Sequence, residues 1–243
     1  LVTTSHSGTI LTTGTNAPGV LMQSIGGGGG RSNVNIIAPS GSLLGTVSLQ
    51  LGGTNGTNET GGAVHRAQTG QVVTTGNLSP AVQLQSIGGG GGSSNLALTG
   101  DGSLAGMTAA TLGAAGGTLL DGGAVSGLFS GGIATLGNNA VGLLAQSIGA
   151  GGGDVRTSGG AAVEAYLGAS AGASGTGGSV NLANDGAIQT QGSRSHGVLL
   201  QSIGGGGGAV LTATPVRNIV LSSQNTGDGG TVTFNQTGSI AAL

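Results

Sequence analysis

The chain has 243 residues, of which 58 are glycine, and only 5% of the residues are charged, giving a formal net charge of −2. Ordinary soluble domains contain about 7% glycine and about 25% charged residues, so the polar surface here must come from Ser, Thr, Asn and Gln. Cysteine is absent, which excludes disulfide bonds and thiolate metal sites. Nucleic-acid binding by phosphate neutralisation is excluded as well, because the only strongly basic residues are five scattered arginines: Arg31, Arg66, Arg156, Arg194 and Arg217.

The composition predicts a thin interior. With one Tyr, two Phe and no Trp, the chain must fill its core with Val, Ile, Leu and Ala. Helix is disfavoured because each of the many glycines costs about 0.8–1.0 kcal/mol relative to Ala in a helix interior. No uninterrupted apolar stretch of about 18 residues occurs, so we expect no membrane-spanning helix. Residues Leu1 to Thr4 do not resemble a signal peptide, and we interpret the chain as an excised fragment.

A repeat runs through the whole chain, and its landmark is the string Gln-Ser-Ile followed by glycines. In chain order, a copy shows Val, Gly, Ile or Val, Thr and Gly at fixed offsets before the string. The strings begin at Gln23, Gln85, Gln146 and Gln201. We therefore predict one repetitive segment, residues 1–243. Its copies lie at about 1–60, 61–121, 122–176 and 177–228, with a partial copy at 229–243.

Within each copy, short aliphatic and β-branched runs alternate with Gly, Asn and Asp, which is typical of short strands separated by turns. The pattern predicts an all-β fold, a right-handed parallel β-helix (β-solenoid) of tandem imperfect repeats. In the fourth copy, three such runs begin at Val180, Ile188 and Val198. Because they span only about 18 residues, we expect them to form one coil, with two to three coils in each copy. About ten coils would then stack into a rod near 50 Å long.

Alternation along the third run places two sets of residues toward the interior. These sets are Val20, Val82, Leu143 and Val198, and, two positions later, Met22, Leu84, Ala145 and Leu200. The Gln of the string is expected to face outward or to satisfy its amide with backbone groups. An unpaired buried amide would cost about 1–3 kcal/mol.

The glycine runs indicate close backbone approach, because each glycine costs about 0.5–1 kcal/mol relative to Ala. A P-loop would need lysine, which is absent, and a dinucleotide fingerprint would need glycine where Arg31, Ser93 and Ala209 stand. Collagen would need glycine at every third residue. A flexible linker is the remaining alternative, and the aliphatic residues at fixed offsets from Gln argue against it.

The polar residues suggest no reaction chemistry. Polysaccharide cleavage would need two acids, or an acid and a base, in one cleft. The acidic residues are spread along the chain and are mostly flanked as in turns: Glu59, Asp101, Asp121, Asp154, Glu164, Asp185 and Asp228. The histidines lack metal-ligand spacing and are expected in solvated loops: His6, His65 and His196. Calcium nonapeptides need Asp after each glycine run, and only the third run has one. We predict no catalytic, cofactor-binding or metal-binding residues and no enzyme activity.

The passage from Gly186 to Gly208 reads Gly-x-Ile-x-Thr-x-Gly and then Gly-Val-Leu-Leu-Gln-Ser-Ile-Gly-Gly-Gly-Gly-Gly. It resembles the glycine-rich passenger repeats of large bacterial autotransporters, and the resemblance spans essentially the whole chain. The resemblance implies a β-helical stalk on the bacterial surface, secreted through a C-terminal outer-membrane barrel, with roles in adhesion, aggregation or biofilm. Neither the barrel nor a signal peptide is part of this sequence.

The resulting hypothesis is an extracellular structural stalk or fibre segment, tethered to the outer membrane through parts outside this sequence. The alternatives are an adhesin module that binds ligands through its variable segments, and a subunit of a self-assembling filament. The expected partners are neighbouring repeats of the same chain, other copies of it, or a ligand on a host or neighbouring cell. Nucleic acid, membrane insertion of this segment and cofactors are not expected.

Overall fold

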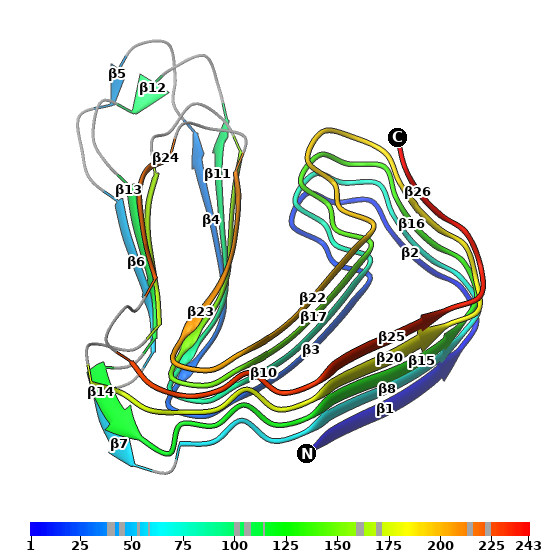
Figure 1. Cartoon of the computed structure of the whole chain (residues 1–243). Helices are drawn as coiled ribbons and strands as arrows, with labels where there is room; N and C mark the ends of the chain where they lie inside the picture. Colours follow the sequence, from blue (N-terminus) through cyan, green and yellow to red (C-terminus); the bar gives the residue numbers. More distant parts are fainter. Residues whose placement is uncertain are drawn as a thin grey trace.

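The computed structural model describes residues 1–37, 42–43, 47–52, 54–57, 59–99, 103–104, 108–113, 115–158, 163–168, 172–212, 216–221 and 225–243. Within these ranges the chain forms strands and no helix, and the paired strands run parallel. The predicted all-β class with parallel strands is confirmed, and the arrangement is consistent with a β-solenoid. Figure 1 shows the repeats stacked on one another, with each repeat following nearly the same path.

Three sheets surround a first lobe, which lies on the right of Figure 1. One sheet contains β1 (Val2–Ser7), β8 (Val64–Thr69), β15 (Val125–Ser130), β20 (Val180–Asn184) and β25 (Val232–Gln236), in this order. Another contains β2 (Ile10–Thr12), β9 (Val72–Thr74), β16 (Ile133–Thr135), β21 (Ile188–Thr190) and β26 (Ile240–Ala242). The last contains β3 (Val20–Ile25), β10 (Val82–Ile87), β17 (Leu143–Ile148) and β22 (Val198–Ile203).

Two further four-stranded sheets form a second lobe on the left of Figure 1. One contains β4 (Gly29–Ile37), β11 (Gly91–Thr99), β18 (Gly152–Ser158) and β23 (Gly207–Thr212). The other contains β6 (Val47–Leu51), β13 (Thr108–Leu112), β19 (Val163–Leu167) and β24 (Val216–Leu221). Two strand pairs complete the lobe: β5 (Ser42–Leu43) with β12 (Ser103–Leu104), and β7 (Thr54–Thr57) with β14 (Ala115–Thr118).

Paired residues in neighbouring strands lie a whole repeat apart. The side chains of Gln23, Gln85, Gln146 and Gln201 stack in successive strands at separations of 62, 61 and 55 residues. Each repeat is therefore a single coil. The expectation of two to three coils per repeat, and with it a ten-coil rod near 50 Å long, is wrong. Five strands of one sheet span four steps of about 4.8 Å, or about 19 Å.

The number of coils in each repeat differs from the expectation because of what the chain does at the end of the Gln-Ser-Ile strand. The expected coil closed there, but the chain instead turns at the glycine run into the second lobe before it reaches the next repeat. At this corner, successive coils lie very close. A Cβ atom on Gly91 would lie 2.0 Å from the carbonyl oxygen of Gly152, and the φ angle of Gly91 is +128°. The glycine run thus serves close backbone approach, as its cost in the sequence indicates.

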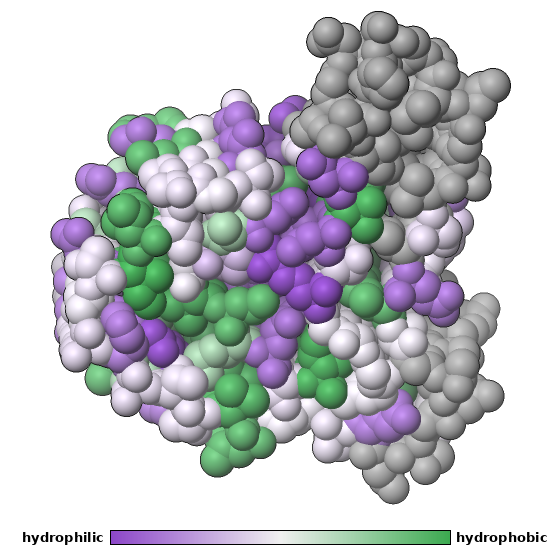
Figure 2. Space-filling view, turned by 180° about the vertical axis from the view of Figure 1, so that it is seen from behind, coloured by the Kyte–Doolittle hydropathy of each residue, from purple (hydrophilic) through white to green (hydrophobic). Residues whose placement is uncertain are grey.

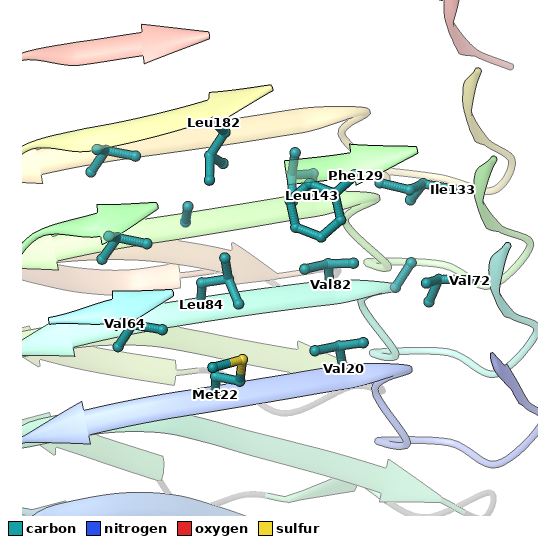
Figure 3. Packing of buried hydrophobic residues seen from close by; sticks show 14 of the residues in the cluster. Val20, Met22, Val64, Val72, Val82, Leu84, Phe129, Ile133, Leu143 and Leu182 are labelled. Carbon is teal, nitrogen blue, oxygen red and sulfur yellow. The ribbon is translucent and has the colours of Figure 1, made fainter. Parts of the chain in front are cut away.

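Aliphatic side chains from all three sheets fill the first lobe (Figure 3). Period-two alternation puts one face of each strand inward, so the same column repeats in every coil. The inward prediction is confirmed: Val20, Val82, Leu143, Met22, Leu84 and Ala145 are buried in this cluster, and Val198 and Leu200 pack against it. Phe129 also enters the cluster, and Gly127 leaves room for its ring, since a Cβ there would lie 2.6 Å from that ring.

A smaller apolar cluster fills the second lobe, between the sheet that contains β4 and the sheet that contains β6. Leu112, Val155, Ala165 and Leu167 are buried there, with Leu51 and Val210 packed against them. These residues come from β6, β13, β18, β19 and β23. The second lobe therefore has its own thin core, and the coil consists of two apolar compartments joined at the glycine corner.

Candidate functional site

A buried polar region lies between the two lobes, where β3, β10, β17 and β22 turn their second face toward β4, β11, β18 and β23. We call this interface the seam. Alternation puts Gln146 on the seam because its neighbour Ala145 faces the first-lobe core. In β18, the same rule puts Asp154 and Arg156 on the seam, because Val155 between them faces the second-lobe core.

A ladder of glutamine side chains runs along the seam. In each step an amide Nε2 donates to the next Oε1 over 2.7 Å, from Gln23 to Gln85, to Gln146 and to Gln201. The column faces away from the first-lobe core, as expected, but the second lobe buries Gln85 and Gln146, while Gln23 and Gln201 at the ends are half-buried. The expected backbone bond is only a longer second contact, 3.5 Å from Gln146 to the carbonyl of Gly153. Stacked amides satisfy one another here.

Asp154 is the acceptor at the centre of the seam. Its Oδ2 lies 2.8 Å from Nη2 of Arg156, and both side chains are 0% exposed. Gln83 and Gln85 each donate to Oδ1 over 2.8 Å, and the Ser93 hydroxyl donates to Oδ2 over 3.3 Å. Nη1 of Arg156 donates to Oε1 of Gln83 over 3.2 Å, while its Nε has no partner. The carboxylate thus joins strands of both lobes.

Burial dominates the electrostatics of this pair. Loss of solvation raises the pKa of Asp154 above its ordinary value, against the opposing effects of Arg156, the Ser93 and Gln85 hydrogen bonds and Arg31. The same loss of solvation lowers the pKa of Arg156, and Asp154 opposes that shift. Buried ion pairs of this kind rarely add net stability, but removing one partner leaves an uncompensated charge.

The seam changes character along the stack. At the first repeat, Nη2 of Arg31 donates to the carbonyl of Asn16 in the first lobe, and burial lowers the pKa of Arg31. Toward the last repeat the contacts become apolar: Val141, Leu144 and Leu211 are buried together, and Leu199 packs against them. Ala209 and Leu211 occupy the register positions of Asp154 and Arg156. The polar and apolar versions of the seam therefore coexist in one molecule.

The geometry of the seam is that of a structural joint. A group that acts on a solute must reach it, and the side chains of Asp154 and Arg156 have no exposed surface. Every oxygen of the carboxylate is already engaged by a donor from the protein. What the arrangement does chemically is to tie β10 to β18, and so one lobe to the other.

The acidic residues were predicted to lie in turns, and four of them do lie between strands. Glu59, Asp121, Asp185 and Asp228 lie between strands. Two others do not: Asp154 lies in β18 and Glu164 in β19, where the Tyr166 hydroxyl donates to it over 3.3 Å. Both stand where alternation, not a turn, decides the side chain's direction. Asp101 lies outside the described residues.

The histidines are exposed, as expected, but two of them lie in strands and not in loops. His6 is in β1 and His65 is in β8, while His196 lies before β22. His6 and His65 both lie in the first strand of a coil, which begins at Val2 in β1 and at Val64 in β8. Among the residues that the structure describes, no three His, Asp or Glu side chains gather as a metal site.

A second buried arginine lies in the first lobe. Arg66 in β8 is 6% exposed, and its neighbours are polar groups without charge. Nη1 donates to the hydroxyl of Thr4 over 2.7 Å, Nη2 donates to Oε1 of Gln68, and Nε has no partner. Sequence reasoning treated all five arginines as scattered single cations, and it missed both this residue and the Asp154–Arg156 pair.

A signal for the missed pair was present. Asp154 and Arg156 are two positions apart directly after a glycine run, and in a strand such residues share one face. For Arg66 the signal was its position two residues after Val64, in a column that holds Gly127 and Leu182 in later coils. Both signals need the knowledge that each run is a strand with one buried face.

On the surface, apolar residues lie among hydrophilic ones, as Figure 2 shows for one face. Large exposed apolar residues include Leu11, Leu119, Leu128 and Leu136. Among the described residues there is no helix long and apolar enough to cross a membrane. A scan against protein-family models, a search of curated proteins and a search of solved structures each found no match to this chain.

Proposed function

We propose that the chain is a structural stalk or fibre segment of a surface-exposed bacterial autotransporter passenger, wound as a right-handed β-helix of tandem imperfect repeats. The observation that carries the proposal is the in-register stacking of the repeats. In the five sheets of four or five strands, each strand pairs with the matching strand of the next repeat, and residues at the same repeat position meet in columns. Such a stack lengthens by adding coils, without needing a new kind of interface.

The burial of one column supports this interpretation. Val64, Val125 and Val180 are all 0% exposed, because a coil covers each of them on both sides. Val232 in the last strand of the same column is 44% exposed. Each coil is therefore stabilised mainly by its neighbours, as in other repeat proteins. The partners that the proposal assigns first are neighbouring repeats, and its location is the bacterial cell surface.

Extension by whole coils can be tested with a register-preserving fusion. Ala242 is level with Thr190 and, through the earlier coils, with Thr12, so Leu243 is level with residue 13. Residue 14 is therefore the next position of the coil after residue 243. We would therefore join residues 1–243 directly to residues 14–243. The fusion adds four coils, and we expect one continuous particle that is about 19 Å longer along the stacking axis. Small-angle scattering measures the length and the cross-section.

The control is the same fusion with a flexible Gly-Ser spacer at the junction, which gives two particles joined by a tether. Direct and spaced fusions should share the far-ultraviolet circular dichroism of strands, but only the direct fusion should keep the cross-section of the single chain. A direct fusion that scatters like the spaced one would contradict the proposal, because the coils would then fail to stack across the junction.

A further inference from the structure

Three buried polar atoms of the seam have no hydrogen-bond partner among the residues that the structure describes. They are Nε of Arg156, Oδ1 of Asn95 and Oδ1 of Asn139. None of the three residues is more than 2% exposed, so solvent at the surface does not reach them. Folded proteins satisfy nearly all such groups with a protein group or with a bound water molecule. These atoms therefore mark a place where a small molecule can bind.

The fold brings the three side chains together in its two middle coils. Asn95 in β11 and Arg156 in β18 are register partners, so their side chains lie on the same face of the sheet, about 4.8 Å apart along the stack. Asn139 lies between β16 and β17, and its Nδ2 donates to the carbonyl oxygen of Thr157, the neighbour of Arg156, over 3.4 Å. The strands β11, β16 and β18 each have a paired strand on both sides. Neither end of the stack contributes to the site.

The hydrogen-bonding character of each atom is fixed by its surroundings. Nδ2 of Asn95 donates to Oδ1 of Asn33 over 2.8 Å, and Nδ2 of Asn139 donates to Thr157. Exchanging oxygen and nitrogen in either amide would put two acceptors face to face, so both unsatisfied amide atoms are oxygens and acceptors. Nε of Arg156 carries a hydrogen and is a donor. The site thus offers two acceptors and one donor.

This set of groups selects the chemistry of the ligand. The positive charge of Arg156 disfavours a cation. The two amide oxygens disfavour an anion, and Arg156 already has Oδ2 of Asp154 at 2.8 Å. A neutral molecule with two donors and one acceptor complements all three atoms. Water has these groups, and a buried water typically makes about three hydrogen bonds. It is also the smallest such molecule, which suits a site between neighbouring strands.

We propose that the seam between the second and third coils binds one structural water molecule. The water accepts a hydrogen bond from Nε of Arg156 and donates to Oδ1 of Asn95 and Oδ1 of Asn139. It thereby links β11 to β18, and the second lobe to a turn of the first lobe. In the fourth coil, Leu211 and Arg194 occupy the positions of Arg156 and Asn139, and Leu211 has no polar side-chain group. The site belongs to one level of the stack and is independent of the stalk function proposed above.

Enclosure of the site determines how slowly this water exchanges. Because the three residues are buried between the lobes, the water leaves only when the seam opens. Collective openings of this kind take about microseconds to milliseconds, and water on the open surface exchanges far faster. The bound water is therefore distinguished by its residence time. Magnetic relaxation dispersion of ¹⁷O in a solution of the complete chain counts such long-lived waters.

The test variant is Asn139→Leu, which copies Leu78 at the same position of the preceding coil. Asn139 and Leu78 have φ angles of 52° and 58°, so this backbone conformation accepts leucine. The leucine side chain removes one acceptor, fills the site and leaves Nε of Arg156 to donate directly to Asn95. We expect the number of long-lived waters to fall by one. Equal numbers in wild type and Asn139→Leu would overturn the proposal.

The matched control is Asn138→Ser at the exposed neighbouring position, which copies Ser193 of the next coil. Its side chain does not reach the seam, so we expect the number of long-lived waters to equal that of wild type. A loss in Asn138→Ser as large as the loss in Asn139→Leu would count against the assigned site.

A direct readout on the wild-type chain covers the case in which Asn139→Leu does not fold. In ¹⁵N-labelled protein, we expect a cross-peak between Nε–H of Arg156 and the water resonance, with the sign that a dipolar contact has in a ROESY spectrum. No cross-peak, or one with the sign of proton exchange alone, would contradict the proposal. A crystal structure in which Nε of Arg156 donates directly to either amide oxygen would contradict it as well.

Discussion

The first-lobe core and the seam are both buried, and both repeat in register through the stack, yet their contents are opposite. Columns of the core carry aliphatic side chains such as Val64, Val125 and Val180, all without exposed surface. Columns of the seam carry Gln85 and Gln146, equally buried, which depend on hydrogen bonds to each other. A core column accepts any aliphatic residue of similar size. A seam column instead requires a specific hydrogen-bonding partner in the next coil.

The difference teaches how a chain with so few charges specifies one register. Apolar columns favour stacking but discriminate weakly between neighbouring alignments of similar side chains. An amide ladder discriminates strongly, because a shifted coil would leave buried amides unpaired at about 1–3 kcal/mol each. We infer that the core supplies most of the stability and that the seam supplies most of the alignment.

A charge in the core should have the largest effect. Leu143→Asp places an unpaired carboxylate at a site with 0% exposure, and we expect the unfolding free energy to drop by about 4–5 kcal/mol. Leu128→Asp is the matched control, since Leu128 on β15 is 53% exposed and should change stability by less than about 0.5 kcal/mol. Urea denaturation of the two variants measures both. Similar losses would show that the inward and outward faces are wrongly assigned.

Breaking the ion pair of the seam should have the next largest effect. Asp154→Ala leaves Arg156 buried without its carboxylate, and we expect a loss of about 3–5 kcal/mol. The double variant Asp154→Ala with Arg156→Leu copies the pair Ala209 and Leu211 of the next repeat, and it should recover most of that loss. Denaturation midpoints of the single and double variants give the coupling. Additive losses would mean that the two residues do not act as a pair.

The glycine corner offers a comparison at constant backbone conformation. Gly30 and Gly92 are paired in register, with φ of +135° and +129°. A Cβ on Gly92 would lie 1.9 Å from the carbonyl oxygen of Gly30, whereas one on Gly30 meets nothing within 4 Å. Both Ala variants carry the same conformational strain, so we expect Gly92→Ala to cost about 2–3 kcal/mol more. Thermal unfolding of both variants gives this difference, and equal transition temperatures would rule out the close approach.

The smallest expected effect concerns pH. Burial raises the pKa of Asp154, so the folded chain binds this proton more tightly than the unfolded chain. The resulting stabilisation is complete below the unfolded pKa of about 3.9 and is lost as pH rises through the folded value. Relative to Asp154→Asn, wild type should therefore lose stability with rising pH, by at most about 1.4 kcal/mol per pH unit. Urea titrations at several pH values would reveal the opposite slope if Arg156 outweighed burial.

The apolar part of the fold was predictable, and the path of the coil was not. Columns through Val82 and Leu84 follow from fixed offsets to Gln85 and from strand alternation, and the glycine content excludes helix. How many residues close a coil depends on which strand stacks on which. Three runs within 18 residues fit a small coil equally well, because nothing local in the sequence shows that the chain first enters a second lobe.

The seam was harder to predict because its chemistry changes from coil to coil. One register position holds Arg31, Ser93, Asp154 and Ala209 in successive repeats, so no residue type marks it. The Gln column repeats, as does the Ile two positions later on the same face, but the burial of the Gln column depends on the second lobe covering it. The same lack of repetition hid Arg66, whose column otherwise holds Thr4, Gly127, Leu182 and Phe234.

Because one repeat is one coil, the unit that a gene can gain or lose is also the unit that the fold can gain or lose. Ala63 and Ala124 occupy the same position in successive coils, before Val64 and Val125. Deletion of residues 64–124 would join Ala63 to Val125 and remove one complete turn, and the strands on either side of the deletion are in register to pair in the five larger sheets. Unequal recombination between the Gln-Ser-Ile-glycine segments therefore changes the length of the protein in steps that the architecture accepts, whereas insertion of a single residue into a strand does not.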